Sequence, residues 1–161
     1  MLKNLILIIP GTIWIILCQA APPGDGSEFL YRQAQDKYEV REYKEAGKLL
    51  EDAIAATPGV SRYHHLLGKC FGRMAEQASA LGALSLARKT RLHFEKAVEL
   101  DGENIPALKD LMNYYKQAPG FLGGSRKKAD EIEKKISRIT TQLREIEHPP
   151  QRETDPDPSI M

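Results

Sequence analysis

Apolar residues recur at intervals of three and four along most of the chain, in stripes over residues 43–54, 63–74, 94–98, 105–115 and 129–143. This spacing places side chains on one face of an α-helix, and the alternation typical of a β-strand is missing. Turn-forming residues separate the stripes at Pro58-Gly59, at Asp101-Gly102 and from Pro119 to Gly124. The pattern predicts an all-α chain of six helices joined in pairs. Four helices have a candidate N-cap residue: Ser27, Ser61, Asn104 and Ser125.

The first twenty residues have the layout of a secretory signal. Lys3 precedes an apolar run over residues 5–17, which ends shortly before the small residue Ala21. The run is short for a membrane-spanning helix and contains a Pro-Gly pair, so a cleaved signal is favoured over an uncleaved anchor. A lipoprotein signal with an acylated Cys18 is a third alternative, although the large Leu17 stands where such signals have a small residue.

Four segments are expected along the chain: a signal peptide over 1–20, a linker over 21–26, a helical domain over 27–144 and a tail over 145–161. The tail contains four prolines and no apolar stripe, so it is expected to be disordered. The helical domain is long enough to close one hydrophobic core without disulfides or metals.

Charge and cysteine content narrow the possible functions. The 161 residues include 23 Lys+Arg and 22 Asp+Glu, and this net charge of +1 does not suggest nucleic-acid binding. Lys3 is the only charged residue of the signal, so the exported chain would be neutral. It would retain one thiol, Cys70, which cannot form an intrachain disulfide. Apolar neighbours at helical spacing predict that Cys70 is a small core residue.

Two segments share one pattern of large and small residues. In the first, the order small, small, large, small, proline is found at Ala34, Ala46, Leu50, Ala53 and Pro58. The second repeats much of this pattern at Leu67, Gly68, Phe71, Phe94 and Ala97, and it ends in FEKAVELDGEN over residues 94–104. Both segments resemble the tetratricopeptide repeat (TPR) family of helical hairpins. A degenerate third unit contains Leu108, Leu111, Tyr115 and Ala129.

The resemblance implies a TPR-like solenoid of about three helical hairpins, in which the first helix of each hairpin lines a concave face. The second and third units are ten and five residues longer than the first between matching positions. The extra residues enter the turn inside each hairpin, and the resemblance places these turns on one edge of the stack.

The extra residues are apolar, whereas surface turns are normally polar. They fall in residues 78–86 and 118–124, and the candidates for exposure are Leu81, Leu84, Phe121 and Leu122. The two segments could pack on each other, or the first could prolong a helix; alternatively, they form a partner-binding patch. The string APGFLGGS over residues 118–125 resembles one found in exported bacterial proteins of this repeat class.

A second candidate surface follows from the repeat register. Opposite the apolar stripes, the first helices place polar and aromatic residues at spacings of three and four: Tyr31, Gln35, Tyr38, Arg62, His65, Lys69, Arg73, Lys109, Asn113 and Lys116. These residues would form a basic groove suited to a carboxylate-bearing or acidic peptide, with the tyrosines adding contact area. The alternative is that the stripe is simply a solvated helix face.

Some tetratricopeptide proteins hold a peptide C-terminus in a carboxylate clamp. Lys109 and Asn113 match the opening residues of that clamp. Three other positions depart from it, at Tyr31, Leu66 and Asp110, which argues against a complete clamp.

The sequence contains no recognisable catalytic or cofactor motif. The histidines and Cys70 lack the spacing of paired metal ligands, so no metal site is predicted. The glycine-rich segment after Pro119 lacks the order of a phosphate-binding loop, and no motif of an activated nucleophile is present. A protein that is not an enzyme and has no cofactor is therefore expected.

These observations together predict a protein–protein interaction scaffold of the bacterial periplasm or cell envelope. Its partner would be another protein or peptide, which could be acidic, and no nucleic acid. Membrane contact is expected only through the N-terminal segment, if that segment is uncleaved or lipidated. The alternative function is an accessory component of a solute-uptake system that binds a small ligand.

The N-terminal layout makes a testable prediction about export. The mature chain should begin at or near Ala21, because the short interrupted apolar run suits a signal better than an anchor. N-terminal sequencing of the natively expressed protein measures this directly. An intact Met1 in a carbonate-resistant membrane fraction would show an anchor instead, and an acylated Cys18 would show a lipoprotein.

Overall fold

Six α-helices make up most of the described chain. The computed structural model describes residues 25–147, and within them it contains no β-strand, which confirms the all-α prediction. The helices are α1 (Asp25–Glu39), α2 (Tyr43–Ala56), α3 (Ser61–Gln77), α4 (Ala80–Leu100), α5 (Ile105–Gln117) and α6 (Arg126–Glu147). A short 3-10 helix, η1 (Gly120–Leu122), lies between α5 and α6.

The ends of the helical region differ from the expected boundaries. α1 begins at Asp25, inside the predicted linker 21–26, and α6 ends at Glu147, inside the predicted tail 145–161. The extension of α6 is explained by its last residues, which are good helix formers. The predicted signal peptide and the rest of the predicted tail lie outside the described residues.

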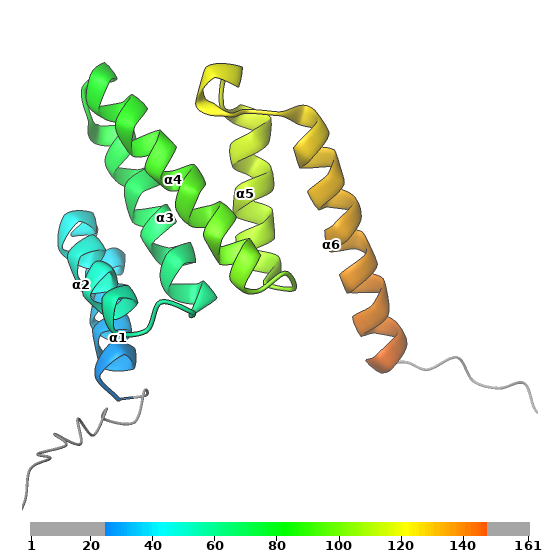
Figure 1. Cartoon of the computed structure of the whole chain (residues 1–161), viewed down its shortest axis with the longest axis horizontal. Helices are drawn as coiled ribbons and strands as arrows, with labels where there is room; N and C mark the ends of the chain where they lie inside the picture. The colour runs from blue at the N-terminus through cyan, green and yellow to red at the C-terminus, as the bar shows by residue number, and fades with distance from the viewer. Residues whose placement is uncertain (1–24, 148–161) are drawn as a thin grey trace, which may run out of the picture.

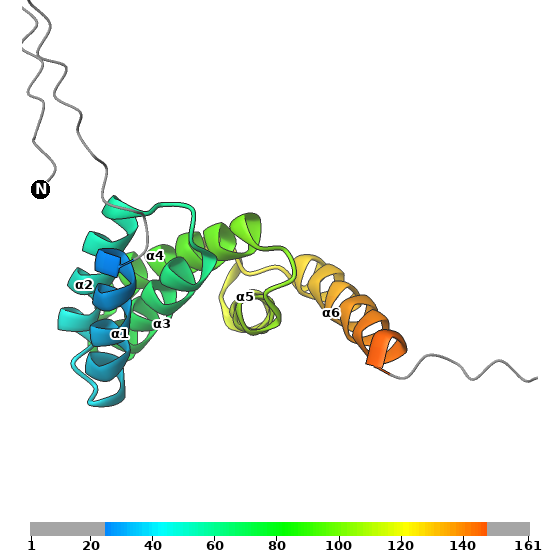
Figure 2. The same ribbon diagram turned by 90° about the horizontal axis from the view of Figure 1, so that it is seen from below.

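Consecutive helices run in opposite directions and pack on each other (Figure 1). Each helix contacts its neighbours in the chain, and the main contact of α6 is with α5. Seen from below, the α1–α2 pair, the α3–α4 pair, α5 and α6 follow one another across the molecule (Figure 2). The three connections at residues 40–42, 78–79 and 118–125 therefore lie towards the same end of the molecule, the upper end in Figure 1.

The larger hydrophobic cluster joins α1, α2 and α3. Ala34, Ala46 and Ala53 have no exposed surface, and their small side chains let the three helices approach closely. Leu50 is fully buried between them. Cys70 is buried in the same cluster, as its apolar neighbours predicted, and burial raises the pKa of its thiol to about 12. A thiol with so high a pKa is a poor nucleophile, so Cys70 contributes packing.

A second cluster joins α4, α5 and α6 through Phe94, Leu111, Tyr115 and Ala129. The two clusters meet at the contact between Gly68 of α3 and Phe94 of α4. A Cβ atom on Gly68 would lie 2.6 Å from Phe94 Cδ1, a distance that real Cβ contacts do not reach. Only glycine fits at this position without displacing the Phe94 ring.

The first apolar insertion lengthens helices instead of forming a loop. Only Ala78 and Ser79 separate α3 from α4, which have 17 and 21 residues. Of the alternatives weighed for residues 78–86, the structure therefore contains the prolonged helix. Leu81 nevertheless remains 83% exposed, and Leu84 is 36% exposed.

Two of the four predicted N-caps are confirmed. The Asn104 side chain accepts a hydrogen bond from the Ala107 N–H, and the Ser125 hydroxyl accepts one from the Lys128 N–H. The Ser27 and Ser61 predictions are wrong, because both residues lie inside helices. The Ser61 hydroxyl instead donates to the Ala97 carbonyl, 2.8 Å away, and so ties the start of α3 to the end of α4.

Two histidines add a polar link between α3 and α4. His64 Nδ1 lies 3.3 Å from His93 Nδ1, and His64 Nε2 lies 3.2 Å from the Pro58 carbonyl oxygen. A carbonyl oxygen can only accept, so in this arrangement His64 carries its proton on Nε2 and accepts through Nδ1 from the Nδ1–H of His93. The neutral pair thus ties the α2–α3 turn to α4.

Protonation of this pair is disfavoured in the fold. Burial, helped by His64 and Lys89, lowers the pKa of His93 to about 4. Burial also lowers the pKa of His64, where the Pro58 carbonyl acts in the opposite direction. Both rings are therefore neutral near pH 7 in the folded chain.

Enlarging a small residue between packed helices should destabilise the fold. Ala53 and Ala97 have no exposed surface, so Ala53→Leu or Ala97→Leu should lower the free energy of unfolding by about 1–3 kcal/mol. Urea unfolding followed by circular dichroism measures the change. Ala55→Leu on the exposed side of α2 is the matched control and should be nearly neutral. Equal stabilities for all three variants would contradict the packing described.

Acid should weaken the α3–α4 link. Because both histidines have pKa values below their ordinary 6.5 in the fold, the unfolded chain binds more protons in acid. The neutral pair should make its full contribution to the free energy of unfolding above pH 6.5. This contribution should decrease by about 1–3 kcal/mol as the pH is lowered towards 4.

Urea unfolding across this pH range measures the effect, and His93→Phe isolates it. The variant removes one titrating ring where Phe71 already packs against it, with ring centroids 5.4 Å apart. Its stability should change less with pH than that of the parent. Parallel curves for His93→Phe and the parent would count against the pair as the acid-sensitive element.

Candidate functional site

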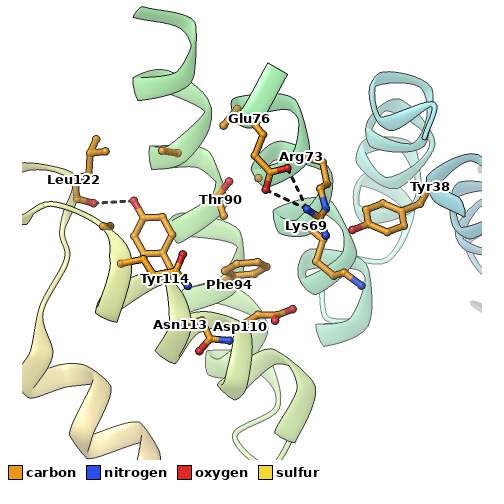
Figure 3. A pocket seen from close by; sticks show the side chains of 15 residues that line it. Tyr38, Lys69, Arg73, Glu76, Thr90, Phe94, Asp110, Asn113, Tyr114 and Leu122 are labelled. Carbon is orange, nitrogen blue, oxygen red and sulfur yellow. Dashed lines mark hydrogen bonds and ion pairs between the residues drawn. The ribbon is translucent and has the colours of Figure 1, made fainter. Parts of the chain in front are cut away.

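The main cavity lies between α3, α4 and α5, with α1 and η1 at its margins (Figure 3). Its volume is about 500 Å³, within the range of many ligand pockets. We call it the central groove. Its lining includes residues of α1, α3, α4, α5 and η1, namely Tyr38, Lys69, Gly72, Arg73, Ala75, Glu76, Ala87, Thr90, Phe94, Asp110, Asn113, Tyr114, Gln117, Ala118 and Leu122.

The floor of the central groove is apolar. Phe94 and Leu122 are 6% and 8% exposed, and Gly72 and Ala87 lie beside them in the lining. Thr90 is also buried, and its hydroxyl donates to the Leu86 carbonyl at 3.0 Å. The floor therefore has no unpaired hydroxyl donor at Thr90 and suits an apolar group of a ligand.

The wall formed by α3 carries two cations, of which one is ion-paired and the other lies over an aromatic ring. Arg73 donates from Nη1 to both oxygens of Glu76, at 3.2 and 3.1 Å. Lys69 Nζ lies 4.8 Å from the centre of the Tyr38 ring, and it forms no ion pair with any residue in 25–147. Lys69 is only partly exposed, so its ammonium group is the charge that a ligand's carboxylate could approach.

The wall formed by α5 is polar. Asp110 Oδ2 lies 2.8 Å from His65 Nε2 of α3, which links the two walls. Asn113 is exposed at the rim, and the Tyr114 hydroxyl donates to the Leu122 carbonyl at 3.0 Å. This last bond holds η1 against the floor. Asn113 offers an amide donor and acceptor on the α5 side of the groove, across from Lys69 on α3 (Figure 3).

The structure brings together only part of the predicted groove. Tyr38, Lys69, Arg73 and Asn113 line the cavity, and His65 contacts it through Asp110. The other five predicted residues do not line it: Tyr31, Gln35, Arg62, Lys109 and Lys116.

The expectation of a basic groove is corrected by ion pairs between elements. Arg62 is paired with Glu28 of α1, and Lys116 with Glu133 of α6 at 3.2 Å. Within the central groove Glu76 and Asp110 offset the two cations. The groove therefore has mixed charge, and its positive field is local to Lys69.

The predicted apolar edge is also divided. Leu81, Leu84 and Phe121 are exposed, whereas Leu122 is buried against the central groove. The 3-10 turn of η1 points neighbouring side chains in different directions, so Phe121 and Leu122 cannot share one face. Leu122 is thus a groove residue, and the prediction that it belongs to the exposed edge is wrong.

Sequence reasoning missed several lining residues. The sequence predicts Phe94 only as a residue of the repeat pattern, and it does not indicate that Thr90, Glu76 and Tyr114 line a groove. The spacing of Glu76 three residues after Arg73 on a helix predicts their pairing. Whether Thr90 and Phe94 line the groove depends on how α4 lies against α5. No local sequence pattern specifies that arrangement.

Other kinds of site were sought in residues 25–147. No group of three or more His, Cys, Asp or Glu residues there could hold a metal ion. None of the helices in that range combines the length and the apolar character that a membrane span requires. The chain matches no known family among those compared, and no curated protein is significantly similar to it.

Proposed function

We propose that this protein is a non-enzymatic interaction scaffold of the TPR type, exported to the bacterial periplasm or cell envelope. It holds a segment of a partner protein in the central groove. The observation that carries the proposal is that Lys69, partly buried beside an apolar floor, forms no ion pair with any carboxylate among residues 25–147. Such a site can take an apolar side chain and a neighbouring carboxylate at the same time.

The burial of small residues supports the repeat register. Ala34, Ala46 and Ala53 stand at the small positions of the first unit, and Ala97 stands at one in the second; all four have no exposed surface. Gly68 lies against Phe94 of α4, where an added Cβ would be 2.6 Å from Phe94 Cδ1. These are the positions at which helical hairpins of the tetratricopeptide type need small residues.

The rim of the central groove favours an extended segment. Arg73, Glu76, Asn113 and Gln117 are exposed around it, so a chain can enter and leave without a closing lid. An apolar side chain would rest on Phe94, and an adjacent acidic group would reach Lys69. The main-chain amides of the segment would meet the polar rim.

The alternative of a small-ligand site in a solute-uptake system rests on the same cavity. A volume of about 500 Å³ is also sufficient for a small carboxylic acid. The two functions differ in what Lys69 must hold, a side chain of a partner or a free acid.

Reversing the charge of Lys69 should remove most partner binding. Lys69→Glu places a carboxylate where the ligand's own carboxylate would lie, and we expect at least a roughly tenfold weaker capture, about 1.4 kcal/mol. Crosslinking in the native envelope followed by purification measures the partner retained. The salt dependence of capture should also decrease, because the interaction is electrostatic.

Lys109→Glu is the matched control for this experiment. It makes the same charge change on an exposed residue of α5 outside the central groove. Circular dichroism should show that both variants keep their helicity. Equal capture by Lys69→Glu and Lys109→Glu would refute the groove as the binding site, whereas loss of binding to free carboxylic acids without any captured protein would favour the alternative.

A further inference from the structure

We propose that the end of the molecule opposite the α1 N-terminus docks on an anionic lipid surface. The surface concerned, here called the turn end, consists of the α3–α4 turn with the start of α4, together with η1 and the start of α6. Its exposed apolar residues Leu81, Leu84 and Phe121 do not line the central groove, and its function does not depend on what the groove binds.

Exposed apolar side chains mark both parts of the turn end. Leu81 in the first turn of α4 is 83% exposed, and Leu84 lies one turn further along the helix. Phe121 in η1 is 71% exposed. Single exposed hydrophobic residues are common on proteins, but here they stand at the tips of two hairpins that end at a similar height (Figure 1).

Hydrogen bonds fix the backbone of the turn that carries Phe121. Its neighbour Leu122 is buried and receives the Tyr114 hydroxyl on its carbonyl. The Ser125 N–H donates to the Tyr115 carbonyl at 3.0 Å, and Gly123 adopts a φ of 90° beside Arg91. This backbone is therefore anchored close to Phe121, which fixes the point from which its side chain projects.

Exposed cations are present in the same helices that form the turn end. Arg88 of α4 and Arg126 and Lys127 of α6 are exposed, and within residues 25–147 none of them forms an ion pair. The nearest acids along α6, Asp130 and Glu131, begin in the following turn. Exposed cations beside protruding Leu and Phe side chains suit the interface of an anionic bilayer, with headgroups for the charges and acyl chains for the apolar tips.

The three turns do not all end at the same height. In Figure 1 the α1–α2 turn ends below the α3–α4 turn and η1. A flat surface laid on the turn end therefore meets α4 and η1 first.

A lipid surface explains this pattern better than a protein partner. Leu81 and Phe121 protrude from separate turns, and neither lines the central groove. Protein interfaces place their aromatic anchors in closely packed patches. Protruding tips with unpaired cations instead match a soft, negatively charged surface into which separate side chains can insert.

Fluorescence of labelled tips tests the proposal. Leu81→Cys and Phe121→Cys, each labelled with an environment-sensitive nitrobenzoxadiazole dye, would be mixed with phosphatidylglycerol vesicles. All variants carry Cys18→Ser, and buried Cys70 will not react. Both labels should brighten several-fold and shift to shorter wavelength, and vesicles of phosphatidylcholine alone should produce little change. This readout reports entry of the tip into lipid however the N-terminal segment is held.

Two matched controls make the result specific. Phe29→Cys labels a residue that is 60% exposed in the first turns of α1, at the opposite end of the molecule, and its dye should stay in water. Arg126→Gln with Lys127→Gln should weaken the vesicle titration by about fivefold for each cation removed. Lys134→Gln with Arg138→Gln, further along α6, should leave it nearly unchanged.

Several outcomes would overturn the proposal. Tip labels that do not respond to phosphatidylglycerol would exclude lipid contact at the turn end. An equal response at position 29 would show unspecific adsorption. A response that depends on protein concentration and needs no vesicles would assign the tips to contact between copies of the chain.

Discussion

The close crossing of α3 and α4 at Gly68 is the contact on which the described architecture depends. A side chain there would collide with the Phe94 ring and press on the Thr90 carbonyl, 3.3 Å from an added Cβ. Because Gly68 has none, Phe94 can occupy the space between the two hydrophobic clusters and also form the groove floor. Lys69, the next residue along α3, is thereby placed at the mouth of the groove. The glycine at position 68 thus allows the core to pack closely and places Lys69 in the candidate site.

The sequence was informative about elements that local spacing determines. The stripes predicted the all-α class, Asn104 and Ser125 were recognised as caps, and the small residues Ala53 and Ala97 are buried. In each case the relevant physical requirement lies within one helix or one turn. The same is true of Cys70, whose apolar neighbours on α3 predicted its burial.

The composition of the groove could not be predicted in the same way. The partners of its cations come from other elements, as when Glu28 of α1 pairs with Arg62 of α3 or Glu133 of α6 pairs with Lys116 of α5. A projection of one helix shows which cations share a face, but it contains no information about the acids that neighbouring helices bring to them. The projected stripe therefore overstated the positive charge, and Lys69 stands out only after the pairs between helices are known.

The short helix η1 contributes neighbouring side chains to two different surfaces. Leu122 closes the floor of the central groove, while the adjacent Phe121 projects at the turn end. The Tyr114 hydroxyl fixes this division, since its bond to the Leu122 carbonyl holds the backbone between the two side chains. One short peptide segment thus supplies a side chain to the groove floor and another to the turn end, with the backbone between them held in place.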